Sequence, residues 1–407
     1  MAKRTTNREE PVREKYSDAR EDSGAREAYV RASLALSMIP SVGGGRIRKL
    51  FEHFPEPMSV FTKKWAEISS VSTIGATVAR SIRNFRKWDE VDRLLMMTRK
   101  HRMALVTPLD DCYPFRLHHI YDPPAVLWVK GEPEALKNEF LAVVGTRRPS
   151  EAGREVTIKL TFELIDNMQA GVVSGLAHGI DALAHNAALK RSRCTVAVLG
   201  CGLDRVYPTG NRQLAYSIMN NGGALISEYP PGTKPDAHHF PVRNRIVSGM
   251  SLGVIVTETG IKGGSMITAD LALEQGREVF AVPHDIRNEK GEGCNLIIQR
   301  GWGKLVINAD DIAAELPPGV RVAKPKEQPG NGADTTHSRT FDKAGNRRLD
   351  PKEHKIIQLL SKQTLHIDAL SRKLKSAVHT LLPVLLKLEL DGLVVQRPGK
   401  KFALSEW

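Results

Sequence analysis

Two segments of this sequence place arginine beside small residues where an apolar run gives way to a helical pattern. The stretch "GTRR" at residues 145–148 follows one apolar run, and "HHFPVRNRIVSGMS" at 238–251 carries Arg243 and Arg245 near a helix start. The dipole of a helix disfavours positive charge at that end. An anion bound at the same place would remove the conflict, so this pattern favours a phosphate-bearing ligand.

Further loops repeat this combination of small residues after a strand. "VVSGLAHGIDALAH", "LGCGLDRVYP" and "TETGIKGGSMITADLALEQG" each turn on glycine before a helical pattern. Glycine lets the backbone approach a ligand, and ligands of a parallel sheet bind beyond the carboxyl ends of its strands. The residues that we expect at this edge are Gly145, Thr146, Arg147, Arg148, Ser174, Gly175, Arg243, Arg245, Lys262, Gly263, Gly264 and Ser265.

Catalytic, metal and cofactor sites have weaker support in the same loops. His178, Asp181 and His185 share one helical face, but metal ligands usually come from more than one element, so we expect His178 and Asp181 to brace their loop. No G-x-x-x-x-G-K-[ST] motif occurs, and "GCGLDR" has Arg205 in place of the third glycine of a dinucleotide fingerprint. We therefore expect no metal, no cofactor and no catalytic residue.

The strands that carry these loops are short apolar runs between residues 139 and 316. They are "FLAVVGT", "AGVVSG", "TVAVLGCG", "GALISEY", "LGVIVTET", "EVFAVP" and "KLVIN". Near-continuous apolar runs are typical of parallel strands covered on both faces. Helical patterns separate most of them, which predicts an α/β fold with a Rossmann-like, doubly wound parallel sheet.

The rest of the chain divides by composition. Residues 1–28 have mixed charge and no apolar periodicity, which predicts a disordered tail. Residues 29–102 read as a helical module with helix-hairpin-helix turns at "PSVGGG" and, in a weaker copy, at Gly75. Such a turn either contacts a DNA phosphate through its amides or only packs helices. Residues 103–316 form the Rossmann-like domain with an extended lead-in that includes a strand at 125–129.

The C-terminal part predicts a linker and a small DNA-binding fold. Residues 317–348 are rich in Pro, Gly and charge, which is typical of a flexible linker. Residues 349–407 show three helical stretches and two short strands around a basic turn, the pattern of a winged helix. We place the start of its third helix near Thr380, so that Pro383 lies in the first turn. Such a module binds DNA or protein.

Composition adds a class of partner. The 407 residues carry a formal net charge of +13 with a pI near 9.6, which favours an anionic partner and nucleic acid above all. No run of eighteen apolar residues and no signal-like N-terminus occur, so we expect a cytoplasmic protein without contact with a membrane.

Six motifs in order, between about residues 105 and 315, resemble the DNA-processing protein A (Smf) family of bacterial DNA-protecting proteins. They are "AVVGTRRPSEAGRE", "VVSGLAHGIDALAHNAAL", "AVLGCGLDRVYPTGNRQL", "GALISEYPPGTKP", "HHFPVRNRIVSGMS" and "GGSMITADLALEQGREVFAVP". Matched motif by motif, the resemblance adds Asn244 to the DNA pocket and gives Arg147 and Arg243 the phosphate contacts. Some members have a basic residue shortly before "HFP", where this chain has Asp236 and Ala237.

The resemblance also implies an activity. It implies a non-enzymatic protein that binds and protects incoming single-stranded DNA during natural transformation and homologous recombination. Such a protein loads the RecA recombinase onto that strand against single-strand-binding protein, and it forms homodimers through the Rossmann-like domain. A cationic groove with Phe240 or a histidine available for stacking suits an unpaired strand.

Two other functions stay open from the sequence. The glycine loop beside Glu258 resembles the phosphate-binding loop of lysine-decarboxylase-like phosphoribohydrolases, which would make the protein a nucleotide N-glycosidic hydrolase. A winged-helix transcription regulator, with the sheet as its effector-binding domain, is the third possibility.

Overall fold

The chain forms two compact units that divide between Lys326 and Glu327. The computed structural model describes residues 23–168, 170–316, 351–360, 365–374, 376, 378–390, 393–397 and 401–404. The expected linker at 317–348, and residues 1–22 of the expected tail, lie outside these ranges. Over the described residues, no helix has the length and apolar character needed to cross a membrane.

The N-terminal helices pack around a small apolar core. They are α2 (Ser23–Ser37), α3 (Gly44–His53), α4 (Trp65–Ser69), α5 (Ala76–Arg83) and α6 (Trp88–Lys100), with the short 3-10 helix η1 (Pro57–Phe61). Leu34, Ile47, Leu50, Ile68 and Ile82 are fully buried in this core.

Helix α2 corrects the expected boundary of the tail. It begins at Ser23, so residues 23–28, expected in the tail, are helical. The reason is a tertiary contact: the Arg26 Nε donates to Asp110 Oδ1 at 2.6 Å, and its Nη2 donates to the Leu105 carbonyl at 2.8 Å. Local composition gives no sign of a contact 84 residues away along the chain.

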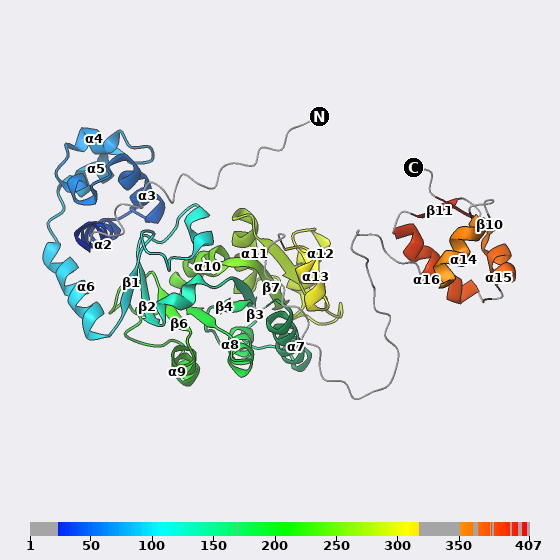
Figure 1. The fold of residues 1–407 in the computed structure, drawn as a ribbon. Coiled ribbons are helices and arrows are strands. Elements are labelled where there is room, and N and C mark those ends of the chain that lie inside the picture. Colours follow the sequence, from blue (N-terminus) through cyan, green and yellow to red (C-terminus); the bar gives the residue numbers. More distant parts are fainter. Residues whose placement is uncertain are drawn as a thin grey trace. The chain divides into compact units, whose positions relative to one another are not determined.

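A nine-stranded sheet forms the centre of the first unit (Figure 1). Its strands are β1 (Ala104–Val106), β2 (Leu127–Gly131), β3 (Phe140–Gly145), β4 (Gly171–Ser174), β5 (Thr195–Val198), β6 (Ala224–Ser227), β7 (Ser251–Glu258), β8 (Glu278–Ala281) and β9 (Lys304–Leu305). Their order is β1-β2-β6-β5-β4-β3-β7-β8-β9. The seven strands from β3 to β9 pair in parallel, as predicted, whereas β1 and β2 add an antiparallel edge.

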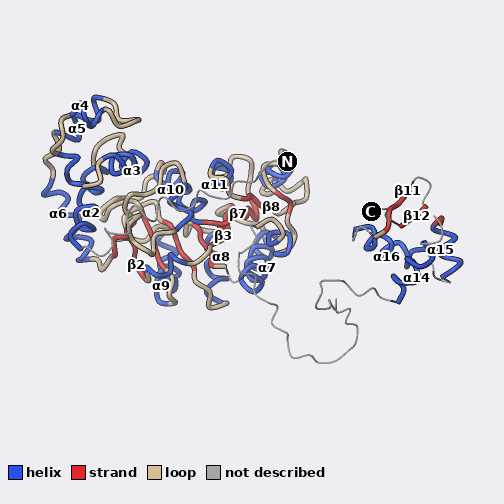
Figure 2. Tube along the Cα trace, turned by 45° about the horizontal axis from the view of Figure 1, so that its top comes forward, coloured by secondary structure: helices blue, strands red, loops and turns tan. Residues whose placement is uncertain are grey.

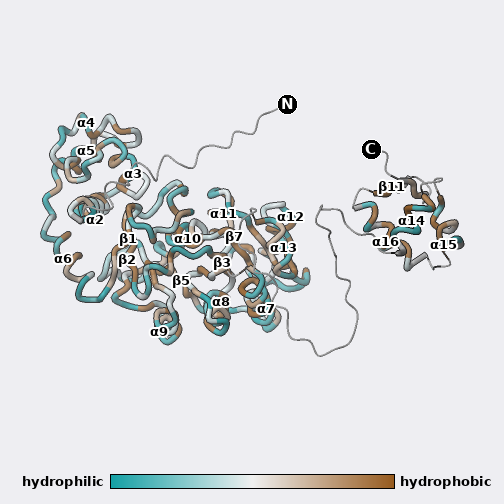
Figure 3. The backbone as a smooth tube through the Cα atoms, viewed as in Figure 1, coloured by the Kyte–Doolittle hydropathy of each residue, from teal (hydrophilic) through white to brown (hydrophobic). Residues whose placement is uncertain are grey.

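Helices cover both faces of this sheet, which gives the doubly wound arrangement (Figure 2). Helices α7 (Glu151–Met168), α8 (Ile180–Lys190), α9 (Arg212–Asn220) and α13 (Ala309–Ala313) cover one face. Helices α10 (His239–Met250), α11 (Gly264–Glu274) and α12 (Glu292–Gln299) cover the other. Figure 3 shows hydrophobic and hydrophilic residues along these covering helices, and their buried apolar residues belong to the clusters that also contain the strands.

The chain reverses its direction of winding between β3 and β7. From β3 it proceeds through β4, β5 and β6 to one side, and from β7 through β8 and β9 to the other. Loops on the two sides of such a switch point diverge and leave a crevice at the carboxyl ends of the strands. The loops after β3, β4 and β7 therefore meet at one edge.

The helical module and the sheet share a continuous core. Met103, Leu109 and Trp128 belong to the same apolar cluster as the helices of the module. Trp128 in β2 also donates from its indole Nε1 to Thr98 Oγ1 of α6 at 3.0 Å. The expected division between 102 and 103 therefore marks a change of secondary structure inside one compact unit.

The second unit is a winged-helix domain. Helices α14 (Pro351–Leu360), α15 (Ile367–Leu374) and α16 (Val378–Leu390) accompany a three-stranded antiparallel sheet of β10 (Leu365–His366), β12 (Lys401–Leu404) and β11 (Val394–Arg397). The sequence predicted the helices and the last two strands but missed β10. The expected start of the third helix near Thr380 was wrong, because α16 begins at Val378 and contains Pro383 beyond its first turn.

Candidate nucleic-acid interface

A groove of about 610 Å³ opens at the carboxyl ends of β3, β4 and β7. Ten of the fourteen residues predicted for the site line it. They are Gly145, Thr146, Arg147, Gly175, Phe240, Arg243, Asn244, Gly263, Gly264 and Ser265. The structure therefore brings loops more than 100 residues apart in the chain to one surface.

One face of α10 forms a wall of this groove. Phe240, Arg243, Asn244 and Val247 all line it. These positions follow the spacing of a single helical face, and they lie in the first turns of a helix that begins at His239. The amide of Asn244 donates to the Gly264 carbonyl at 3.4 Å, which joins this wall to the start of α11.

Arg243 lies beneath the surface of the groove. Its side chain is buried, its Nη1 donates to the Val198 carbonyl, and its Nε has no hydrogen-bond partner. Burial lowers the pKa of Arg243, an effect that the nearby carboxylate of Asp181 opposes. A Cβ at Gly175 would lie 2.3 Å from Arg243 Nη1, so a larger residue there would require the guanidinium to move.

Arg147 and two aromatic rings form the exposed part of the groove. The guanidinium carbon of Arg147 lies 5.9 Å from the centroid of the Phe240 ring, and this ring lies 5.5 Å from that of Tyr207. Arg147 is exposed, and Tyr207 keeps 41% of its surface accessible. The prediction missed Tyr207, although it stands in the "LGCGLDRVYP" loop. A cation beside two accessible rings can hold a phosphate and stack a base.

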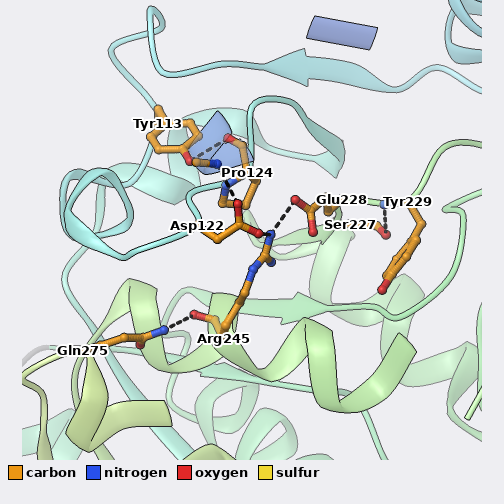
Figure 4. Close-up of polar contacts among 9 residues, drawn as sticks. Tyr113, Asp122, Pro124, Ser227, Glu228, Tyr229, Arg245 and Gln275 are labelled. Atoms are coloured by element: carbon orange, nitrogen blue, oxygen red, sulfur yellow. Dashed lines mark hydrogen bonds and ion pairs between the residues drawn. The ribbon is translucent and has the colours of Figure 1, made fainter. Parts of the chain in front are cut away.

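Four predicted residues lie outside the lining. Arg148 and Lys262 are exposed on neighbouring loops. Ser174 is buried, and its hydroxyl donates to the Val143 carbonyl at 2.7 Å. Arg245 is held by acids: its Nη2 lies 2.6 Å from Glu228 Oε1 and 3.3 Å from Asp122 Oδ2 (Figure 4).

Arg245 is therefore a structural residue, contrary to the prediction. Two residues along a helix correspond to about 200°, so Arg243 and Arg245 face nearly opposite directions. Burial alone would lower the pKa of Arg245, but the carboxylates of Glu228 and Asp122 raise it, and the guanidinium stays charged inside its ion pairs.

The first glycine turn of the helical module is also occupied. The amide of Gly45 donates to Asp122 Oδ1 at 2.6 Å, and a Cβ at Gly44 would lie 1.7 Å from the Pro123 carbonyl oxygen. This turn packs against the lead-in segment, and its Gly45 amide already has an acceptor within the protein.

Glu258, the last residue of β7, caps the start of helix α7. Its Oε2 accepts a bond from the Ser150 amide at 2.7 Å, and its Oε1 accepts one from the Ser150 hydroxyl at 2.6 Å, just before α7. Burial would raise the pKa of this carboxyl, but the bonds from Ser150 and Asn288 bring it below its usual value. A fully buried, ionised carboxylate saturated with donors suits a structural role better than attack on a nucleotide.

Asp181 and His185 lie in α8, and His178 lies in the loop before it. The buried Asp181 accepts bonds from the amides of Gly175 and Ala177 and braces the loop after β4, as expected. His185 is buried with its Nδ1 2.7 Å from Thr195 Oγ1, and burial lowers its pKa to about 3. Among the residues that the structure describes, no group of three His, Cys, Asp or Glu side chains is placed to bind a metal ion.

The sequence matches family models and known proteins. The family model of the DNA recombination-mediator protein A matches residues 104–317, and that of the DprA winged helix domain matches residues 342–400. The DNA processing protein DprA of Streptococcus pneumoniae is 44% identical over 208 residues, which cover 51% of this chain and 72% of that protein. The protein Smf of Synechocystis sp. is 31% identical over 389 residues, which cover 91% and 97%.

A solved structure agrees with these matches. The X-ray structure of DNA processing protein A from Streptococcus pneumoniae superposes with a TM-score of 0.60 at 34% identity, over 70% of this chain and 98% of that one. Because the first family model spans more than half of the chain and includes every strand and loop of the groove, the chain belongs to the DNA recombination-mediator protein A (DprA/Smf) family.

Proposed function

We propose that this protein binds single-stranded DNA in the groove and mediates homologous recombination, including the recombination of DNA taken up in natural transformation. Membership of a DNA-processing family supports the substrate class. The observation that carries the proposal is the placement of Arg147 beside Phe240 and Tyr207, above the buried Arg243.

An unpaired strand fits these groups better than a duplex. Arginine binds phosphate, and accessible rings stack on bases that a duplex keeps inside its own stack. The groove runs over backbone turns at the carboxyl ends of β3, β4 and β7, with Gly145 and Gly263–Ser265 in its lining. Its small residues allow a flexible strand to approach the backbone closely.

The wider activity belongs to the same proposal. The protein protects the incoming strand and loads the RecA recombinase onto it in competition with single-strand-binding protein, without covalent turnover. It acts in the cytoplasm as a homodimer. RecA filament formation on a strand coated with single-strand-binding protein, followed with and without this protein, measures the loading activity.

Arg147 and Arg148 offer a matched test of the binding site. Both are exposed and adjacent, but only Arg147 lines the groove. We expect Arg147→Ala to weaken binding of a short unpaired oligonucleotide about tenfold, which corresponds to about 1.4 kcal/mol. The slope of log affinity against log salt should fall by about 0.7 for the lost phosphate contact.

Arg148→Ala removes the same charge and is the control. Fluorescence anisotropy with single-stranded and duplex oligonucleotides of one sequence gives both affinities. Equal losses in the two variants, or equal affinity of the parent protein for single strand and duplex, would contradict the proposed groove.

A further inference from the structure

The second hairpin of the helical module presents exposed positive charge around an exposed tryptophan. Residues 61–87, which contain α4 and α5, carry six Lys or Arg and a single acidic residue, Glu67. Trp65 has 43% of its surface accessible. Lys64, Arg80, Arg83 and Arg86 are exposed as well. We call Lys64, Trp65, Arg80, Arg83 and Arg86 the outer basic patch.

Contacts within the hairpin position the arginines of this patch. The guanidinium carbon of Arg80 lies 4.8 Å from the centroid of the Trp65 ring, which joins α5 to α4. One turn further along α5, the Nη1 of Arg83 donates to the Phe61 carbonyl at 3.2 Å. The Nη1 of Arg86 in turn donates to the Arg83 carbonyl at 3.2 Å. Arg80 and Arg83 thus lie on α5 with Arg86 just after it, and Arg80 contacts the indole ring that follows Lys64 in the chain.

The two glycine turns of the module differ in what covers them. The turn at Gly43–Gly45 lies against Asp122 and Pro123 of the lead-in. The Gly75 turn is open, because a Cβ at Gly75 would meet no atom within 4 Å. Helix α5 begins after Gly75 with no acidic residue in its first turn and ends with Arg80 and Arg83 in its last turn. Among the residues that the structure describes, the second turn is therefore uncovered, and the patch residues beyond it are exposed.

We propose that the outer basic patch is a second contact for the unpaired nucleic-acid strand, in which the cations bind phosphates and Trp65 stacks on a base. Guanidinium groups and an accessible indole are the combination that single-strand sites use, because every base offers a face to the ring. A duplex or an acidic protein would satisfy the charge but would leave the ring unused. The proposal rests on the proposed function only in taking the same strand as ligand.

The patch and the groove lie on different parts of the first unit. Figures 1 and 2 both show α4 and α5 on the side of the helical module away from the sheet, whereas the groove lies beside α10 and α11. A short oligonucleotide can occupy only one of the two sites at a time, and a long one can reach both. The contribution of the patch should therefore grow with the length of the strand.

A charge-matched pair of variants of the full-length chain tests the patch. Lys64→Ala with Arg80→Ala removes two cations from it, and neither removal breaks a hydrogen bond between α4 and α5. Arg99→Ala with Lys100→Ala removes two exposed cations from the end of α6, outside the patch. Fluorescence anisotropy compares the two variants on a series of unpaired oligonucleotides of increasing length. The shortest of them is just long enough to fill the groove.

The patch variant should match the parent on the shortest strands and bind long strands about tenfold more weakly, with a salt slope smaller by about 1.4. The control should stay within about twofold of the parent at every length. Trp65→Phe should abolish the part of the tryptophan quenching that appears only with long unpaired strands.

Two results would overturn the assignment. The first is equal affinity of patch variant and control at every length, and the second is an equal loss on single strand and duplex with no effect of Trp65→Phe. A failure of the proposed binding site in the groove can be distinguished from a failure of the patch. In that case Arg147→Ala would bind the shortest strands with the same affinity as the parent.

Discussion

The backbone amide of Gly45 donates a 2.6 Å hydrogen bond to the carboxylate of Asp122. The same carboxylate lies 3.3 Å from the guanidinium of Arg245, which also pairs with Glu228 (Figure 4). One acidic side chain thus links the helical module, the lead-in and α10.

We expect Asp122→Ala to lower the free energy of unfolding by about 1–3 kcal/mol, because it leaves the Gly45 amide without an acceptor and leaves Arg245 Nη2 with Glu228 as its single carboxylate partner. Asp122→Asn keeps an acceptor and should cost less. Urea unfolding followed by tryptophan fluorescence measures both. Asp270→Ala, an exposed carboxylate on α11, is the control. A loss for Asp122→Ala no larger than for this control would contradict the link.

The substitution Glu258→Gln tests whether Glu258 acts as a helix cap or as a catalytic carboxylate. Since Glu258 accepts two bonds from Ser150, we expect the variant to lose about 1–2 kcal/mol of stability through the weaker, uncharged acceptor. Neither parent nor variant should release free base from nucleoside monophosphates, as measured by chromatography. Release by the parent that stops in the variant would instead support the hydrolase.

Gly175→Ala and Gly264→Ala change two glycines that line the same groove. A Cβ at Gly175 would lie 2.3 Å from Arg243 Nη1, whereas one at Gly264 would meet nothing within 4 Å. We expect Gly175→Ala to displace Arg243, to lower stability by about 1–3 kcal/mol, and to weaken strand binding. Gly264→Ala, at the first position of α11, should leave stability unchanged or raise it by up to about 1 kcal/mol. Thermal unfolding of both variants checks the contrast, and an equal effect would disprove it.

Because His185 is buried, we expect the protein to lose stability in mild acid. Burial lowers its folded pKa to about 3, below the ordinary 6.5, so the unfolded chain binds a proton that the folded chain excludes. The stabilisation is complete above about pH 6.5 and is lost as the pH falls from there toward 3. Between pH 7 and 5 this residue should account for about 2 kcal/mol. Urea unfolding of the parent and of His185→Gln at pH 7 and pH 5 isolates the contribution of His185 to the free energy of unfolding. If this free energy changed equally with pH in both proteins, the prediction would be contradicted.

The sequence predicted the centre of the fold because the parallel strands are apolar throughout. Strand β7, "SLGVIVTE", is buried at every position, and so is each residue of β4, β5 and β6. The edge was harder to predict. A strand was expected at 125–129 and β2 spans Leu127–Gly131, but local composition does not indicate that it runs antiparallel to β6.

Helical periodicity could have distinguished Arg243, which lines the groove, from Arg245, which does not. Phe240, Arg243 and Asn244 share one face of α10, and Arg245 falls outside it, so the spacing alone argued against a common role. Of the two acids that pair with Arg245, Asp122 could not have been predicted, because it is 123 residues away in the chain. Tyr207 could not be assigned from its loop sequence, because an aromatic residue near a strand end packs in the core as readily as it faces a ligand.

Arg243 gives the groove a cation that a passing strand cannot push aside. With only 5% of its surface accessible and its Nη1 fixed to the Val198 carbonyl, it loses almost no side-chain freedom when a ligand arrives. In the proposed complex, its charge attracts a phosphate in the groove that it lines, while the exposed Arg147 is placed for direct contact. If the groove binds a strand as proposed, this electrostatic attraction does not depend on the bases and exists before the strand enters.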